Sequence, residues 1–369
     1  MNRVVIDACC ESIKGTLMPD RERCPECECP EAEGFGKVNR RHFVQAASAG
    51  AAAMALPRVL RAEESVANAK TPESLVKKLY DSLSEKQKEE ICFSWDYTDD
   101  RKVLRTHVSN NWFITDVKTL GIGTNFYTRD QKDMIEALFW SLYSKDWHDR
   151  IRKQLQDDAG GYGKQQTIAI FGNPGSEKFE LVMTGRHLTI RCDGNTTEHV
   201  AFGGPIFYGH AASGFTEQIN HPGNVFWPQA LKANELFKML DGKQREVALI
   251  EKMPNESAVA FQGKGKFSGL PASELSKDQR EHLQGVLDLL VEPYRLSDRQ
   301  EVTKCLQAQG GLEQVRLLFY REGDLGNDGI WDNWRLEGPS FVWHFRGTPH
   351  VHVWVNVADD PSVLTNARG

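Results

Sequence analysis

No apolar run in the sequence approaches the ~20 residues that a membrane-spanning helix requires. An excess of basic residues is also missing, because 45 Lys and Arg stand against 51 Asp and Glu and give a net charge of −6. Proteins that bind nucleic acid usually carry a basic stripe, so this balance gives no support for such a partner. The composition, 40% hydrophobic and 26% charged, is that of an ordinary globular protein.

Three familiar catalytic signatures are missing. The chain has no Gly-x-Ser-x-Gly nucleophile elbow, no His-Glu-x-x-His zinc motif and no Gly-x-Gly-x-x-Gly fingerprint opening a helix. We therefore expect neither an α/β-type serine hydrolase nor a common metalloprotease, and we expect no nucleotide cofactor.

Cysteine is scarce after residue 30, where only Cys92, Cys192 and Cys305 remain. Three cysteines allow at most one internal disulfide, so no disulfide framework holds the fold. A body of about 300 residues can supply its own hydrophobic core. We expect no cysteine nucleophile, because Cys192 is predicted to face inward and the other two to lie in helices.

Residues 39–62 resemble an export signal. Arg40 and Arg41 precede an apolar, Ala-rich run, and Ala62 is a candidate cleavage position. This pattern is typical of twin-arginine export and predicts a periplasmic or extracellular protein that meets the twin-arginine machinery, with no stable membrane span after processing. An ordinary signal peptide or an uncleaved anchor is the alternative.

The predicted organisation therefore has three parts: a leader at 1–38, the signal at 39–62, and a single domain at 63–369. The leader is rich in cysteine and is expected to be disordered. Its Cys24, Cys27 and Cys29 could gather around zinc, but a fourth ligand at standard spacing is missing. A misassigned start codon would also explain this segment.

Capping patterns predict several helices. Leu83-Ser84 followed by Gln87 is a capping-box start, and the pattern recurs at Leu240–Arg245 and at Leu275–Arg280. We interpret these as three similar helix starts, with an ancient duplication as the alternative. A helix is also predicted over 130–147, with Met134, Leu138 and Leu142 on one stripe.

Period-2 patterns predict strands near 167–171, 179–183, 187–192 and 315–320, and the last of these leads into a four-strand antiparallel meander at the C-terminus. The glycine-rich stretch 203–214 is interpreted as a loop that lines a pocket. Strands grouped with helices elsewhere predict an α+β fold: antiparallel sheet packed with several helices and ending in a C-terminal hairpin.

The region from Trp331 to Val357 contains the most informative pattern. Two alternating runs flank Gly347-Thr348-Pro349, which we interpret as a three-residue hairpin loop with Arg346 opposite His350 and His344 opposite His352. Residues of one parity then share an apolar face. The other face carries a set of polar and aromatic side chains: His344, Arg346, His350, His352 and Trp354.

Three imidazoles on one face of a ribbon could bind a metal ion, because directly opposed residues have Cβ atoms only ~4.5–5.5 Å apart. Neutral imidazole suits zinc, copper, iron or nickel. The alternative is a row of half-buried sheet histidines with hydrogen-bond partners. Arg346 on the same face favours that alternative, because a fixed cation disfavours a bound one.

Several short motifs together resemble the bacterial family called domain of unknown function 3500. They are Ile170–Gly172, Gly185–Leu188, Arg335–Pro339 and Pro349–His352, and the resemblance covers most of the chain after the signal. It implies that His187 matches the second histidine of the family's Gly-Gly-His-His-Leu motif, and that His350 and His352 match its His-x-His. The family often has glutamate where this chain has His344. The family's name implies no established activity.

With this resemblance, the expected metal ligands are His187, His344, His350 and His352, holding zinc, copper or iron. Glu337 is the candidate acid or base, and Arg346 is expected to hold an anionic group. The prediction is an exported metal-dependent hydrolase or oxidoreductase that acts on a small anionic or polar substrate. A non-catalytic metal- or ligand-binding protein is the alternative, and purely structural histidines are a third interpretation.

Overall fold

The computed structural model describes residues 71–175, 178–193, 199–214, 217, 221–326 and 328–367. The predicted leader at 1–38 and the predicted signal at 39–62 lie outside these residues. Within the described ranges, no helix is both long and apolar enough to cross a membrane.

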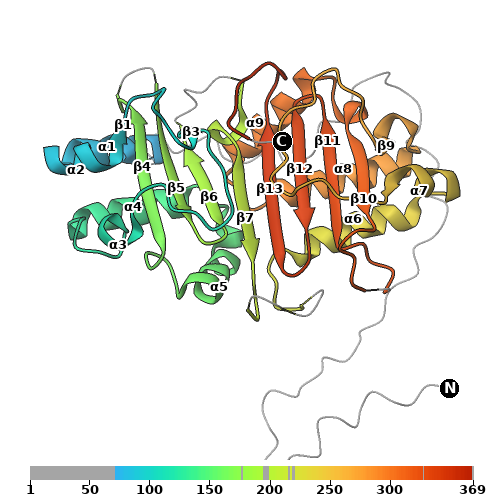
Figure 1. Ribbon diagram of the computed structural model, residues 1–369, viewed down its shortest axis with the longest axis horizontal. Coiled ribbons are helices and arrows are strands. Elements are labelled where there is room, and N and C mark those ends of the chain that lie inside the picture. The colour runs from blue at the N-terminus through green and yellow to red at the C-terminus, as the bar shows by residue number, and fades with distance from the viewer. Residues whose placement is uncertain are drawn as a thin grey trace, which may run out of the picture. The chain divides into compact units, whose positions relative to one another are not determined.

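A single 11-stranded sheet runs through the described part of the chain (Figure 1). Its order is β1-β4-β5-β6-β7-β13-β12-β11-β10-β8, and β9 pairs with β10. The pairs β1–β4 and β8–β10 are parallel, and the other pairs are antiparallel. The strands of this sheet are β1 (Cys92–Phe93), β4 (Gln166–Gly172), β5 (Phe179–Gly185), β6 (Leu188–Cys192), β7 (Ile206–His210), β8 (Leu249–Ile250), β9 (Leu270–Pro271), β10 (Arg316–Tyr320), β11 (Asn333–Gly338), β12 (Phe341–Arg346) and β13 (Val351–Val357). The separate two-stranded sheet consists of β2 (Thr98–Asp99) and β3 (Lys102–Val103).

Helices and strands alternate in groups along the chain, as an α+β fold requires. The α-helices are α1 (Pro72–Ser82), α2 (Glu85–Ile91), α3 (Val117–Leu120), α4 (Arg129–Ser141), α5 (His148–Ala159), α6 (Trp227–Met239), α7 (Gly242–Ala248), α8 (Lys277–Val291) and α9 (Leu296–Ala308). This arrangement confirms the predicted fold class and the predicted C-terminal meander β10-β11-β12-β13.

The two halves of the sheet have the same arrangement of strands, counted inward from each edge. Each half has a short parallel edge strand, then a four-strand antiparallel meander that ends at the centre, where β7 meets β13 (Figure 1). Along the chain, two pairs of helices precede the meander of each half. They are α1, α2, α4 and α5 in the first half and α6 to α9 in the second. The fold therefore favours the alternative, an internal duplication, over three helix starts that are merely similar.

Matching glutamine pairs support this repeat. Gln87, which completes the capping box of α2, donates from Nε2 to Gln131 Oε1 at 2.9 Å. In the second half, Gln244 donates from Nε2 to Gln279 Oε1 at 3.1 Å. Gln131 and Gln279 belong to the capping boxes of α4 and α8. The box that opens α4 at Thr128 was missed by the sequence pattern, because no leucine precedes it.

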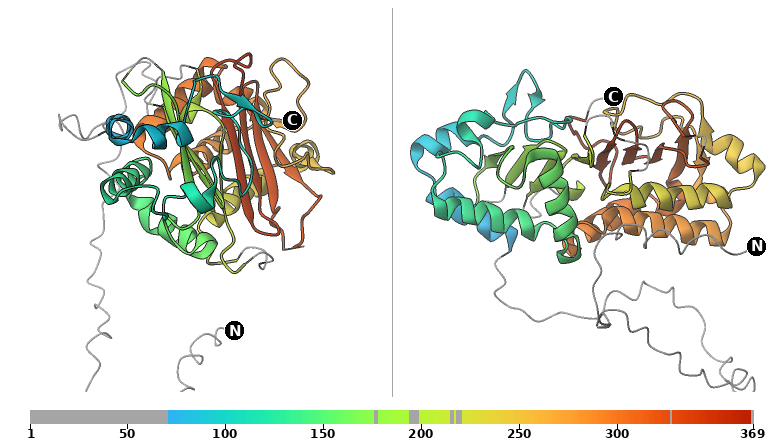
Figure 2. Two further views of the ribbon diagram at one scale, coloured as in Figure 1. Left: turned by 60° about the vertical axis from the view of Figure 1, so that its left-hand side comes forward. Right: turned by 90° about the horizontal axis from the view of Figure 1, so that it is seen from below.

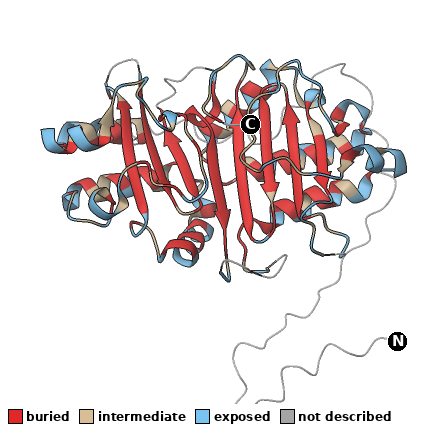
Figure 3. Cartoon of the chain, in the orientation of Figure 1, coloured by how far each residue is buried: buried red, intermediate tan, exposed pale blue. Residues whose placement is uncertain are grey.

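The two faces of the sheet differ in character. The helices lie on one face of the sheet (Figure 2). The main hydrophobic core consists of buried side chains from these helices and from the sheet, whose strands are largely buried (Figure 3). The opposite face is more polar and is crossed by irregular segments. Trp112 Nε1 donates to Thr189 Oγ1 at 2.8 Å, and Ile114 N–H donates to Thr184 Oγ1 at 2.8 Å. Polar side chains on this face therefore anchor the covering loops.

The predicted register of the final hairpin is wrong by two residues. Arg346 pairs with His352, and His344 pairs with Trp354. The cause lies outside the hairpin: Gly347 N–H bonds to Asp332 O at 2.9 Å, and Val351 pairs with His210 of β7. A shift of two preserves the face to which each side chain points, so the predicted faces are retained.

Two smaller predictions also need correction. The stretch 203–214 is not all loop, because β7 occupies its centre and places Tyr208 and His210 in the sheet. Cys92 lies in β1, although Cys305 lies in α9 as expected. Cys192 is buried in the main core, as predicted.

Candidate metal centre

Three histidines from distant parts of the chain meet near the centre of the sheet, on its polar face. His187 lies in the turn between β5 and β6, whereas His350 precedes β13 and His352 lies on it. All three are buried. They come from both halves of the sheet, so neither half holds the full set.

The turn that carries His187 has specific local requirements. His187 adopts a φ of +52°, and its N–H donates to Asn111 Oδ1 at 3.0 Å. Its ring reaches across β7 at Gly209. A Cβ on Gly209 would lie 3.2 Å from His187 Cδ2 and 2.3 Å from Val351 O. Glycine at this position therefore lets the imidazole approach β13.

The Nε2 atoms of the rings converge. His352 Nε2 lies 3.1 Å from His187 Nε2 and 3.0 Å from His350 Nε2. Nitrogens bound to tetrahedral zinc at ~2.0–2.1 Å would lie ~3.3 Å apart. Among the residues that the structure describes, these three form the one group of three or more His, Cys, Asp or Glu ligand atoms that all lie within 4.8 Å of one another.

In two of the rings, the other nitrogen, Nδ1, contacts a carboxylate. Asp158 Oδ2, at the end of α5, lies 2.8 Å from His187 Nδ1. Glu256, on the segment after β8, has Oε2 3.2 Å from His352 Nδ1. A histidine that binds a metal commonly donates its other N–H to a carboxylate, which fixes its tautomer and orientation.

The tautomer of each ring decides where its lone pair points. A neutral imidazole has one N–H, so a ring that donates from Nδ1 carries a lone pair at Nε2. When both rings donate from Nδ1 to these carboxylates, two lone pairs face each other across 3.1 Å, an arrangement that is repulsive without a cation or proton between them. The donor set consequently fits a transition metal, while a shared proton on His187 is the competing explanation.

The fixed cation on this face is compensated. Arg346 Nη1 lies 3.0 Å from Glu256 Oε2. Burial raises the pKa of Glu256, and the charge of Arg346 opposes that rise. Glu256 therefore offsets the positive charge of Arg346 that would disfavour a bound cation.

Burial also acts on the other groups. It lowers the pKa of His352 well below the usual range, and the charge of Arg346 adds to this effect. Burial opposes ionisation of Asp158, but the contact with His187 and hydrogen bonds from Ala211 N–H and Gln154 Nε2 outweigh it and hold the pKa of Asp158 below its ordinary value. His352 is thus neutral and Asp158 is ionised near neutral pH.

The structure brings together three of the four predicted ligands. His344 stays apart: it is fully buried opposite Trp354, and its Nδ1 accepts a hydrogen bond from Arg335 Nε at 3.2 Å. Glu337 also lies elsewhere, opposite Val342 and 3.4 Å from Arg335 Nη1. Arg346 borders the cluster, but through Glu256.

Sequence reasoning missed Asp158 and Glu256. Asp157 and Asp158 stand in the last turn of α5, where the helix dipole disfavours acidic side chains. That unfavourable placement was an available signal of a specific role. Glu256 carries no comparable signal, because it lies in an irregular segment.

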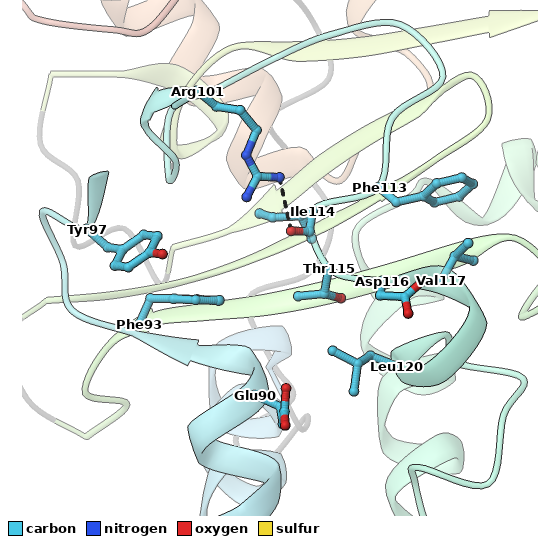
Figure 4. A pocket seen from close by; sticks show the side chains of 10 residues that line it. All are labelled: Glu90, Phe93, Tyr97, Arg101, Phe113, Ile114, Thr115, Asp116, Val117 and Leu120. Carbon is cyan, nitrogen blue, oxygen red and sulfur yellow. Dashed lines mark hydrogen bonds between the residues drawn. The ribbon is translucent and has the colours of Figure 1, made fainter. Parts of the chain in front are cut away.

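A separate open groove of about 520 Å³ lies beside β1 (Figure 4). Phe93, Tyr97 and Phe113 line it, with Arg101 bonded through Nη1 to Ile114 O at 3.2 Å. None of its lining residues belongs to the histidine cluster.

Comparison with known proteins identifies the family. The model of the family described as "Protein of unknown function (DUF3500)" matches residues 65–359. A search of curated proteins found no match, and a search of solved structures found none either. Because the match covers most of the chain, including all three clustered histidines, this chain belongs to the DUF3500 family of proteins of unknown function.

Proposed function

We propose that this chain is an exported, metal-dependent enzyme in which His187, His350 and His352 hold one zinc, copper or iron ion. The observation that supports this proposal is the convergence of three Nε2 atoms, two of them on rings whose Nδ1 faces a carboxylate. Three protein ligands are typical of catalytic sites, which keep a further position open.

The chain's own residues would have distinct roles. A metal held here would polarise a substrate oxygen or, if it is copper or iron, exchange electrons. Asp158 and Glu256 hold the Nδ1 protons of His187 and His352 and so orient the rings. Arg346, which pairs with Glu256 and has a side chain 15% exposed, would bind an anionic group of the substrate. The proposed reaction is hydrolysis or oxidation of a small anionic or polar substrate.

Export is a separate part of the proposal. The Arg40-Arg41 pair and the apolar run after it support passage through the twin-arginine machinery to the periplasm or beyond. That route is associated with proteins exported already folded, often with a cofactor loaded, which agrees with a metal acquired before export.

A non-catalytic metal carrier is the second candidate. Burial favours it, because the side chains of His187 and His352 are 0% and 4% exposed. An enzyme would turn over a substrate with the metal bound, whereas a carrier would only bind and release the ion.

Elemental analysis of the purified protein tests the proposal. We expect about one zinc, copper or iron per chain, and restoration of that content after chelation and addition of the same metal. Screening the loaded and chelated forms against esters, phosphoesters and oxidisable substrates then separates enzyme from carrier. A protein that is isolated without metal and fails to bind added zinc, copper or iron would contradict both candidates.

Asp158→Asn should weaken metal binding by roughly 10–100-fold, the usual effect of losing a carboxylate that orients a ligand. The asparagine removes the charge that supports His187 but leaves the three ligands in place. Competition against a coloured chelator measures the affinity. Asp157→Asn is the matched control, because Asp157 contacts His210 and Lys153 instead. Equal affinities for the two variants would contradict the assigned role of Asp158.

A further inference from the structure

Two mostly irregular segments cross the polar face of the sheet, one in each half. Residues 94–116 follow the short edge strand β1, and residues 251–269 follow the short edge strand β8. The two segments meet beside the histidine cluster, where Asn110 Nδ2 donates to Glu256 Oε1 at 3.4 Å. Asn110 is exposed, and the side chain of Glu256 is 17% exposed. This contact therefore lies at the surface, next to three buried histidines.

The second of these segments is fastened on both sides of a short tip. Met253 N–H donates to Glu322 Oε2 at 2.8 Å, and Ala258 O accepts from Arg335 Nη2 at 2.8 Å. We call the residues between these two anchors, 254–257, the tip. A short stretch between fixed ends can move by changing a few backbone dihedral angles, while the rest of the segment stays in place.

The tip places Glu256 on Arg346. Glu256 Oε2 lies 3.0 Å from Arg346 Nη1 and 3.2 Å from His352 Nδ1. The proposed function needs Arg346 to bind an anionic group of a substrate. Because Glu256 already provides an anion at this position, a substrate anion can take the position only after Glu256 has moved away.

Arg346 also has binding capacity that this arrangement leaves unused. Its Nη2 donates to His350 O at 3.3 Å, but its Nε is a buried donor without a hydrogen-bond partner among the described residues. A guanidinium can donate two parallel N–H bonds to one carboxylate, which makes that pair stronger than a single contact. A carboxylate that is not tethered to the tip could turn to accept from Nε and a neighbouring Nη together.

We propose, on the basis of the proposed function, that the tip is a lid over the candidate metal centre and that the carboxylate of a small substrate opens it by replacing Glu256 on Arg346. The incoming group matches Glu256 in charge and shape, so it also keeps an anion beside His352 Nδ1. Arg346 pairs with His352 across β12 and β13. The remainder of the substrate would therefore lie next to the three histidines. The substrate class is a small carboxylic acid in its ionised form.

Calorimetric titration of the full chain with succinate tests the exchange of anions. Glu256→Gln removes the internal competitor but keeps the size of the side chain, so it should bind succinate about 10-fold more tightly than the natural protein. Adding Arg346→Met to Glu256→Gln should abolish the binding, and that double variant leaves neither charge of the pair without its partner. Glu251→Gln is the matched control. Glu251 begins the same segment but pairs with Arg321 at 2.8 Å, so its replacement should not change the affinity.

Cleavage by a glutamate-specific protease tests the lid itself. With succinate bound, cleavage after Glu256 in the natural protein should become severalfold faster, because proteolysis follows the population of the open form. Cleavage after the exposed Glu251 should keep its rate and serves as the internal reference. Mass spectrometry of the fragments distinguishes the two positions.

Both experiments are repeated on metal-loaded and on chelated protein, which separates the lid from the metal. A response to succinate in the chelated protein would support the lid even if the metal proposal fails. Equal succinate affinities of the natural protein and Glu256→Gln, no binding by either, or cleavage after Glu256 that succinate does not accelerate would overturn the inference. Inorganic phosphate that binds as tightly as succinate would overturn the assignment of a carboxylate.

Discussion

Replacing both His350 and His352 with alanine should reduce the bound transition metal from about one ion per chain to none. The variant keeps only His187 of the three converging Nε2 donors, and one imidazole cannot retain an ion against a chelator. Elemental analysis after gel filtration measures the content, and titration with cobalt or zinc measures any residual affinity.

His282→Ala is the control for this experiment. His282 lies on α8 and contacts Lys232 O and Glu235, far along the chain from the cluster. We expect it to keep its full metal content. If the double variant retains the ion, another site holds it. If the natural protein has no metal and the double variant only changes stability, the histidines have a structural role and share a proton instead of a metal ion.

Replacing Glu180 with alanine should destabilise the fold by about 3–5 kcal/mol, the usual cost of leaving a buried charge without its partner. Glu180 is fully buried, with Arg105 Nη1 at 2.7 Å and Arg191 Nη1 at 3.0 Å. Arg191 also donates to Pro205 O and His107 O. The substitution would strand two guanidinium groups beneath the covering loop, and urea unfolding measures the loss.

Two further variants serve as controls for the Glu180→Ala measurement. Asp149→Ala removes an exposed pair with Arg152 and should change stability by less than ~0.5 kcal/mol. Arg105→Met/Glu180→Leu/Arg191→Met removes all three charges and should recover part of the lost stability, because apolar groups need no partner but Pro205 O and His107 O lose their donor. A small effect of Glu180→Ala would show that the network contributes little.

The internal repeat explains why the candidate centre is asymmetric. The β5–β6 turn is closed by Gly185 and Leu188, and the corresponding β11–β12 turn is closed by Gly338 and Phe341. Counting through the turns places Ser340 where the first half has His187. The two halves share a scaffold, but each contributes different side chains at the central strands.

The sequence alone predicted much of the local structure. Capping residues determined where α2, α7 and α8 begin, because they satisfy N–H groups within a few residues. Alternation predicted the strands and the two faces of β12 and β13, since that periodicity belongs to the extended backbone itself. The pairing of His350 with His352 on one face followed from the same rule.

Tertiary structure decided which residues meet. The two-residue shift in register moves His344 ~7 Å along the ribbon from the place that sequence reasoning gave it, without changing its face. That register depends on bonds to Asp332 and β7, which are remote in the chain. Asp158 and Glu256 reach the cluster through a helix end and an irregular segment, whose positions follow from packing. Short-range sequence patterns do not encode contacts between distant residues. The metal ligands were therefore partly predictable, and the carboxylates that support them were not.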